Sequence, residues 1–178
     1  MLQTFEIIPF QDNNLIESVR GEFETCEKQI IVSYQVIGKI SEVCWPEKDA
    51  SPTRQFGLWE HTCLEFFIGP ATNANYWEFN LSPSGHWNCF SFSDLRTDMQ
   101  ESETLVLSSV ECSVAEEVAT CTALIHCDDM VLSGIRIGIS AVIEHTSGFF
   151  YYALAHYSNA ENSRRPDFHT RENHLLLL

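Results

Sequence analysis

The sequence predicts an all-β protein, a two-sheet antiparallel β-sandwich of the jelly-roll or immunoglobulin-like kind. Apolar and polar residues alternate along a series of short segments, and turn-forming residues separate several of them. Only two short stretches, Asp12–Ser18 and Ala115–Val118, have any helical character. Alternation with a period of two places successive side chains on opposite faces of a strand, whereas a surface helix needs a period of about 3.6.

The predicted strands follow one another along the whole chain. They are Thr4–Pro9, Val19–Thr25, Gln29–Ile37, Thr62–Ile68, Tyr76–Leu81, His86–Ser93, Leu105–Cys112, Val118–His126, Ile135–Glu144 and Phe149–Ala155. In Gln29–Ile37, the side chains of Ile30, Val32, Tyr34 and Val36 share one face. Such a face is expected to point into a hydrophobic core.

The connections contain residues that favour reversals of the chain. Ser82–Gly85 joins two aromatic strands and Thr146–Gly148 joins two others, and glycine supplies the positive φ that such turns often require. The segment Gly38–Gly57 is longer and is expected to be a surface loop. With no linker or repeat in view, residues 1–178 are predicted to form one domain.

Composition excludes some partners. The 178 residues carry 25 acidic and 10 basic side chains, for a formal net charge of −15. The only adjacent basic pair is Arg164 and Arg165. A chain this acidic repels nucleic acid and anionic lipid, so neither is an expected partner.

The N-terminal residues and the cysteines bear on location. Residues Met1–Phe10 lack the basic and apolar regions of a secretory signal, and no apolar run is long enough to span a bilayer. The seven cysteines are odd in number and are expected to be reduced, mostly buried thiols. We therefore expect a soluble cytoplasmic protein.

Two aromatic strands offer polar groups for a ligand. In Tyr76–Leu81, Glu78 and Asn80 share a face and lie about 7 Å apart along it. This face is either solvated or holds a small polar ligand. Trp87, next to a turn, is either a stacking platform for a flat ligand or a core residue, and Trp59 either borders a cleft or anchors a loop.

Several motifs resemble a known family. The segments LWEHTCLEFFI at Leu58–Ile68, YWEFNLSPSGHW at Tyr76–Trp87 and PDFH at Pro166–His169 are similar to those of DOMON-like proteins, a group related to the family 9 carbohydrate-binding modules. Ile139–Glu144 and Tyr152–His156 add to the resemblance. It implies a β-sandwich with a ligand-binding face, and better-known DOMON relatives bind sugars or haem. We expect this chain to depart from them as a stand-alone domain without a signal peptide.

These observations predict a non-catalytic binding module for a small carbohydrate or related polar metabolite. The candidate ligand-binding residues are Trp59, His61, Glu78, Asn80, Trp87, Arg96, His156 and His169. Binding pockets combine an apolar lining with a few convergent polar groups. The alternative is a buried polar network that fastens Pro166–His169 to the sheet, and Arg96 alone could pair with Asp94 or Asp98.

Other functions have weaker support. Haem would need an axial pair drawn from Met99, Met130, His156 and His169, and the two methionines lie in polar surroundings. A metal site or enzyme could use His61, His156, Asp167 and His169, but no metal spacing or catalytic motif is present. No metal or cofactor is therefore expected. The final leucines, Leu175–Leu178, either complete a strand or contact a partner chain.

Overall fold

The computed structural model describes residues 1–127, 133–156 and 165–177 and confirms an all-β antiparallel fold. Its strands form a single hydrogen-bonded sheet with the order β7-β6-β5-β4-β10-β11-β1-β2-β3-β9-β8, and β12 pairs with β10 off this path. The strands are β1 (Leu2–Pro9), β2 (Ile16–Cys26), β3 (Gln29–Gly38), β4 (Cys63–Pro70), β5 (Tyr76–Leu81), β6 (Trp87–Phe92), β7 (Gln100–Glu101), β8 (Val106–Val114), β9 (Val118–His126), β10 (Ile135–His145), β11 (Gly148–Ala153) and β12 (Leu176–Leu177). The finer jelly-roll or immunoglobulin-like designation stays a prediction.

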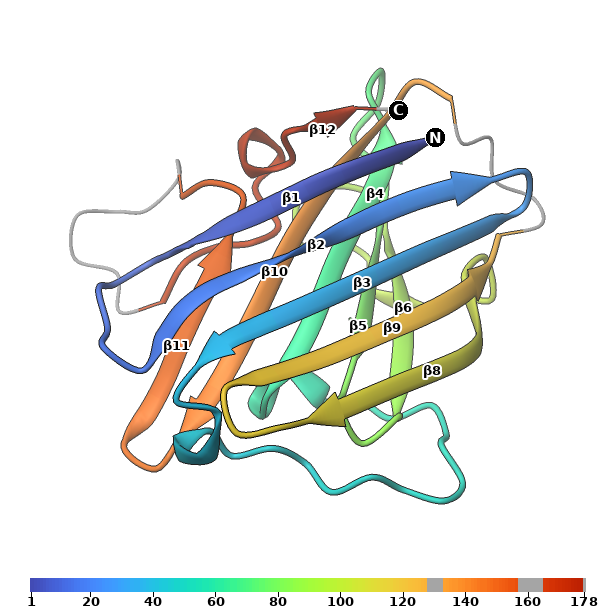
Figure 1. Cartoon of the computed structure of the whole chain (residues 1–178). Helices are drawn as coiled ribbons and strands as arrows, with labels where there is room; N and C mark the ends of the chain where they lie inside the picture. The colour runs from blue at the N-terminus through green and yellow to red at the C-terminus, as the bar shows by residue number, and fades with distance from the viewer. Residues whose placement is uncertain (128–132, 157–164, 178) are drawn as a thin grey trace.

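The sheet curls so that its two ends face each other (Figure 1). Strands β1, β2, β3, β9 and β8 form the layer nearer the viewer, the front half; β4, β5, β6, β7, β10 and β11 form the back half. The halves join where Ile8 of β1 pairs with Ala153 of β11. Between them, Phe23 meets Phe66 edge to face, with ring centroids 5.4 Å apart. The main hydrophobic core therefore lies between the two halves.

The predicted inward faces are confirmed in the central strands. Ile30, Val32, Tyr34 and Val36 of β3 are all buried in the main core. The Tyr34 hydroxyl crosses the core and donates a hydrogen bond of 2.7 Å to the Glu65 carbonyl of β4. A buried hydroxyl normally needs such a partner, so this bond also fixes how the halves meet.

The turn predicted between β5 and β6 is confirmed. Gly85 has φ of +97°, in the left-handed region, and its N–H donates to the Ser82 carbonyl at 2.9 Å. The long connection Gly38–Gly57 contains one short 3₁₀ turn, Ile40–Glu42. Two more 3₁₀ turns, Leu58–Glu60 and Arg171–Asn173, complete the helical content of the described residues. Within those residues, no helix has the length and apolar character needed to cross a bilayer.

The weak helical character of Asp12–Ser18 does not produce a helix, because β2 already begins at Ile16. The Asn13 side-chain oxygen accepts hydrogen bonds from the N–H groups of Leu15 and Ile16, at 3.1 and 2.8 Å. An asparagine used this way forms a local turn that competes with helix. Of the terminal leucines, Leu176 and Leu177 form a short strand that pairs with β10, which is one of the two expected arrangements.

The expectation that all seven cysteines are reduced is wrong for one pair. Cys112 and Cys121 stand opposite each other on β8 and β9 and form a disulfide. Sequence reasoning missed this pair because the register of a hairpin decides which residues face each other. Of the five free cysteines, Cys63, Cys89 and Cys127 are buried, and Cys26 and Cys44 are exposed.

Candidate functional site

The outer face of the back half carries a second apolar cluster, distinct from the main core. Its buried members are Leu58, Cys63, Phe67, Tyr76, Phe90, Phe92, Val142, Ala153 and Phe168. Strand register places two carboxyl groups among them. Glu65 of β4 is opposite Asn80 of β5, and Glu78 of β5 is opposite Phe67. Glu65 and Glu78 are therefore diagonal neighbours on one face, within reach of each other's charge.

A hollow of about 430 Å³ opens over this face, and we call it the aromatic hollow. It is lined by Trp59, Glu65, Phe67, Glu78, Phe92, Arg96, Met99, Val142, Tyr151, Arg165, Pro166, Phe168 and His169. The 3₁₀ turn Leu58–Glu60 supplies Trp59, whose ring contacts Phe90 at 5.8 Å. The C-terminal residues 165–169 supply another part of the wall.

A polar network ties this C-terminal segment to the sheet. The Tyr76 hydroxyl lies 2.7 Å from His169 Nδ1 and accepts a hydrogen bond of 3.2 Å from the Arg96 N–H. Arg96 donates through Nε and Nη2 to Asp167 Oδ1, at 3.2 and 2.9 Å. Arg96 itself has φ of +52°, so its turn is held in a conformation that few side chains adopt. The polar network predicted as an alternative to a site thus exists as part of the hollow's wall.

The two carboxyl groups are almost fully buried, with 3% of Glu65 and 5% of Glu78 exposed. Burial, followed by the nearby charge of Glu78, raises the pKa of Glu65 to about 8, against a hydrogen bond from Ser140 and the charge of Arg96. Burial raises the pKa of Glu78 to about 7, against a hydrogen bond from Asn80 and the charge of Arg96. The pair therefore holds protons at pH values where an exposed carboxyl is ionised.

The imidazole of His169, which lies next to Glu78, is neutral. Burial, followed by the charge of Arg96, lowers the pKa of His169 to about 3. His169 Nε2 lies 3.6 Å from Glu78 Oε2. Burial also raises the pKa of the Tyr76 hydroxyl to about 12. At neutral pH His169 and Tyr76 are therefore neutral, the Glu65–Glu78 pair retains protons, and Arg96 contributes a positive charge to the hollow.

Four of the eight predicted ligand-binding residues meet in the aromatic hollow: Trp59, Glu78, Arg96 and His169. Each comes from a different part of the chain. The partner expected for Arg96 is wrong, because the guanidinium pairs with Asp167 and not with Asp94 or Asp98. Asp167 follows Arg96 by 71 residues, a distance over which spacing gives no information.

Asn80 and Trp87 do not line the hollow. Asn80 is fully buried on the same face of the sheet, opposite Glu65, and donates a hydrogen bond of 2.8 Å from Nδ2 to Glu78 Oε1, so it holds the carboxyl group in place. Trp87 lies on the opposite face of the sheet, where it stacks on Phe79 with centroids 5.5 Å apart. Trp87 is opposite Leu81 in the β5–β6 register, and cross-strand partners share a face. Trp87 was predicted to border the site, but it lies in the main core instead.

His61 and His156 also lie elsewhere. His61 Nδ1 is 2.9 Å from Glu144 Oε2, in a separate depression formed with the Gly38–Gly57 connection. His156 Nε2 is 3.0 Å from the Ile8 carbonyl, where β1 meets β11. Of the methionines considered for haem, Met99 lines the hollow and Met130 lies outside the described residues. In the described part of the chain, no three His, Cys, Asp or Glu side chains gather as a metal site would require.

Sequence reasoning missed Glu65 as a site residue, although a signal was present. Strand β4 reads CLEFFIGP, apolar on both faces apart from this glutamate. A carboxyl group in such a strand must be buried, and buried carboxyl groups are uncommon unless they are paired or functional. Tyr151 and Phe168 gave no comparable signal, because nothing in their spacing brings them to β4 and β5.

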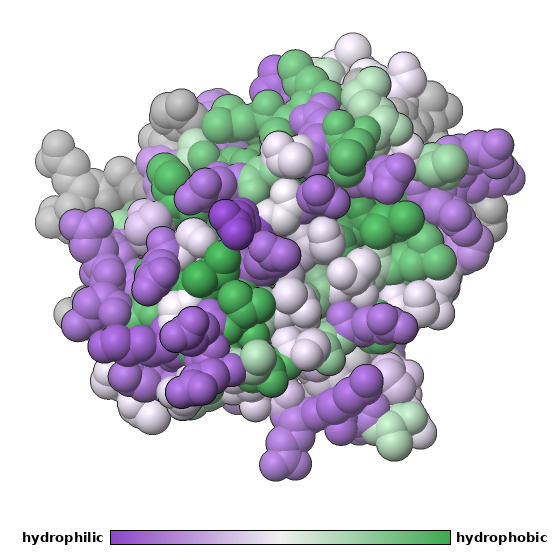
Figure 2. Space-filling view, viewed as in Figure 1, coloured by the Kyte–Doolittle hydropathy of each residue, from purple (hydrophilic) through white to green (hydrophobic). Residues whose placement is uncertain are grey.

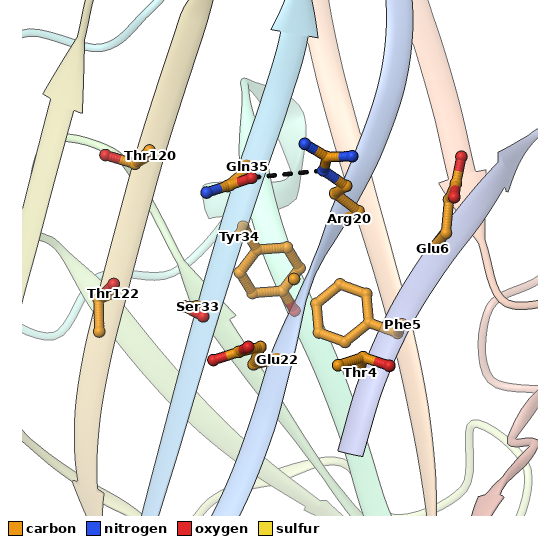
Figure 3. A pocket seen from close by; sticks show the side chains of 11 residues that line it. Thr4, Phe5, Glu6, Arg20, Glu22, Ser33, Tyr34, Gln35, Thr120 and Thr122 are labelled. Atoms are coloured by element: carbon orange, nitrogen blue, oxygen red, sulfur yellow. Dashed lines mark hydrogen bonds between the residues drawn. The ribbon is translucent and has the colours of Figure 1, made fainter. Parts of the chain in front are cut away.

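A second hollow, of about 610 Å³, lies on the outer face of the front half, and we call it the polar hollow. It is lined by Thr4, Phe5, Glu6, Arg20, Gly21, Glu22, Ser33, Tyr34, Gln35, Thr120 and Thr122. These residues lie on β1, β2, β3 and β9, and Figure 3 shows the Phe5 and Tyr34 rings side by side. Arg20 Nε donates to Gln35 Oε1 at 3.3 Å. In Figure 2, hydrophilic and intermediate residues occupy much of this side of the molecule.

Comparison with known proteins gives a fold but no family. No family model and no curated protein matches the chain. Solved structures do match: a "putative carbohydrate-binding protein" of Bacteroides uniformis has a TM-score of 0.62 and 14% identity, over 97% of this chain and 83% of that one.

Two family 9 carbohydrate-binding module structures from Caldicellulosiruptor kristjanssonii also match. The one in complex with glucose has a TM-score of 0.56 and 8% identity, over 91% of this chain and 77% of that one. The one in complex with cellotriose has a TM-score of 0.58 and 7% identity, over 85% and 72%. The fold is thus like that of carbohydrate-binding modules.

Proposed function

We propose that the protein is a non-catalytic carbohydrate-binding module and that a small carbohydrate occupies the aromatic hollow. The observation that carries the proposal is the convergence, in one hollow of about 430 Å³, of aromatic walls with buried polar groups. A sugar ring has apolar faces and a rim of hydroxyl groups, so it needs both kinds of contact at once. The likeness of the fold to carbohydrate-binding modules supports the same proposal.

The lining residues take distinct roles in this proposal. Trp59, partly exposed at the edge of the hollow, stacks on the apolar face of the ring. Glu78, held by Asn80, and Arg96, held by Asp167, form hydrogen bonds with hydroxyl groups. Because the protein already fixes these side chains, little conformational entropy is lost when a ligand binds.

We also propose that the protein is a member of the DOMON-like group and that it is located in the cytoplasm. The Cys112–Cys121 disulfide gives the location a direct test, since disulfides are rare in reducing compartments. Thiols would be trapped by alkylation in intact cells before lysis. Alkylation of Cys112 and Cys121 would show that the disulfide is opened in a reducing compartment and would support the cytoplasmic location, whereas a fully protected pair would contradict it.

Calorimetric titration with a panel of neutral mono- and disaccharides tests the binding function. At least one sugar is expected to bind saturably, and Trp59→Ala is expected to weaken it at least tenfold. Trp45→Phe is the matched control, because Trp45 packs beside the core and its indole N–H donates to the Ile40 carbonyl. Absence of binding by every sugar tested, neutral or charged, at millimolar concentration, or unchanged binding by Trp59→Ala, would overturn the proposal.

A further inference from the structure

The floor of the aromatic hollow contains two buried acids, Glu65 and Glu78, and neither forms an ion pair with a lysine or arginine of the described residues. Glu65 accepts a hydrogen bond of 2.9 Å from Ser140, and Glu78 accepts one from Asn80. Within the described residues, the only nitrogen base at ion-pair distance from either carboxyl is His169, at 3.6 Å from Glu78. Its imidazole is neutral because burial lowers its pKa to about 3.

Buried carboxylates are normally matched by a positive charge. Arg96 lines the same hollow and its charge lowers the pKa of both acids, but its guanidinium is paired with Asp167 at 2.9 Å and burial still outweighs its effect on the acids. Arg165 lines it from an exposed position, with its guanidinium 5.9 Å from the Phe149 ring. Among the described residues, no arginine or lysine is placed directly against the two acids, so the interior of the hollow above them is a position where a ligand's positive charge would be matched.

The walls around that position also suit a cation. Trp59, Phe67, Phe92, Tyr151 and Phe168 all line the hollow. The face of an aromatic ring attracts a cation, by about 0.5–2 kcal/mol per contact according to how far it is desolvated. The net charge of −15 adds a long-range field that draws cations toward the protein.

We propose that the carbohydrate bound in the aromatic hollow is an amino sugar, whose ammonium group lies over the Glu65–Glu78 pair. This inference rests on the proposed function and specifies its ligand class. The ring stacks on Trp59, the hydroxyl groups reach Arg96, and the amine supplies the counter-charge that the buried acids lack.

Protons accompany such binding. In the free protein the burial of Glu65 and Glu78 raises their pKa values, so the pair holds protons near neutral pH. An ammonium group beside them favours the carboxylate form, and binding releases protons. Among the described residues, the titratable or charged side chains around the pair are Tyr34, Cys63, Tyr76, Arg96, Tyr151, Arg165, Asp167 and His169.

A charge series of one hexose tests the proposal by calorimetry: glucosamine, glucose, N-acetylglucosamine and glucuronate. Glucosamine is expected to bind at least tenfold more tightly than glucose or N-acetylglucosamine, with proton release seen as a dependence of the enthalpy on the buffer. Glu65→Gln and Glu78→Gln should each remove most of this preference and reduce the proton release. Glu144→Gln is the matched control, because Glu144 pairs with His61 outside the hollow.

The outcomes separate this inference from the proposed function. Equal binding of glucose and glucosamine would overturn the amino-sugar inference and leave carbohydrate binding intact. Tighter binding of glucuronate would overturn it in favour of an acidic ligand held by Arg96 and Arg165. Binding of none of the four, with none in the neutral sugar panel, would overturn both. Thermal unfolding of each variant, without ligand, shows whether a lost preference reflects a lost fold.

Discussion

The two hollows differ in what lies at their floors. The polar hollow is the larger, at about 610 Å³ against 430 Å³, yet its charged side chains, Glu6, Arg20 and Glu22, are all exposed. The aromatic hollow places Glu65 and Glu78 out of water. Exposed charges remain solvated and cost nothing, whereas buried ones perturb pKa values and require a partner. The buried chemistry, and not the size, therefore identifies the candidate site.

The largest expected effect concerns the glycine beneath the polar hollow. A Cβ at Gly21 would lie 1.8 Å from the Ser33 carbonyl oxygen and 2.7 Å from the Phe5 ring. Because backbone cannot move aside cheaply, Gly21→Ala is expected to destabilise the fold by about 3 kcal/mol or more. Gly134→Ala, with no atom within 4 Å of its Cβ but φ of +68°, is the control and should cost about 1 kcal/mol. Urea unfolding of both variants checks the order, which equal losses would contradict.

The next effect is a pH dependence specific to the aromatic hollow. The folded-state pKa of Glu65 is raised to about 8, above the value near 4.5 of an exposed group, so ionisation opposes folding. The contribution of Glu65 to stability should therefore fall between pH 5 and pH 8, while the lowered pKa of His169 acts in the opposite direction. Glu65→Gln should remove on the order of 3 kcal/mol of the fall that Glu65 causes.

Glu22→Gln, in the polar hollow, is the matched control for this pH dependence, since Glu22 is exposed. It should change with pH as the wild type does. The free energy of unfolding of wild type and of both variants is measured at pH 5 and at pH 8. If Glu65→Gln and wild type show parallel pH profiles, the raised pKa of Glu65 is refuted.

A smaller effect is expected where the C-terminal segment is fastened over the aromatic hollow. Asp167 Oδ1 accepts hydrogen bonds from Arg96 and from the His169 N–H at 3.1 Å. Asp167→Ala should cost about 1 kcal/mol, because the ion pair is partly exposed, and should weaken ligand binding. Glu103→Ala, which removes the exposed partner of Arg54, should change neither quantity measurably. Unfolding and calorimetric titration of both variants provide the comparison, and tight binding by Asp167→Ala would count against a site at this wall.

The smallest effect is predicted for the polar hollow itself. Arg20 makes one exposed hydrogen bond, to Gln35. Arg20→Ala should change stability by less than about 0.5 kcal/mol and leave sugar binding unchanged. Any substantial loss of binding would show that the front half takes part in recognition.

The sequence by itself determined the strands and their inward faces, because both follow from a local period of two. It also placed Glu78 on the face opposite Phe79, as the structure has it. The ends of strands were less certain: β2 begins at Ile16 and not at the predicted Val19, after a turn made by the Asn13 side chain in a segment with weak helical character. Patterns of polarity report which face a side chain takes, not what covers that face.

Only the tertiary structure decided which residues share the candidate site. Register across β4, β5 and β6 brought Glu65 beside Glu78 and sent Trp87 to the main core. The C-terminal segment crossed back to place Asp167 on Arg96 and His169 on Tyr76, 71 and 93 residues away. These pairings depend on how the sheet curls and on which segment covers it, and both are set by packing between distant parts of the chain, which leaves no trace in local spacing.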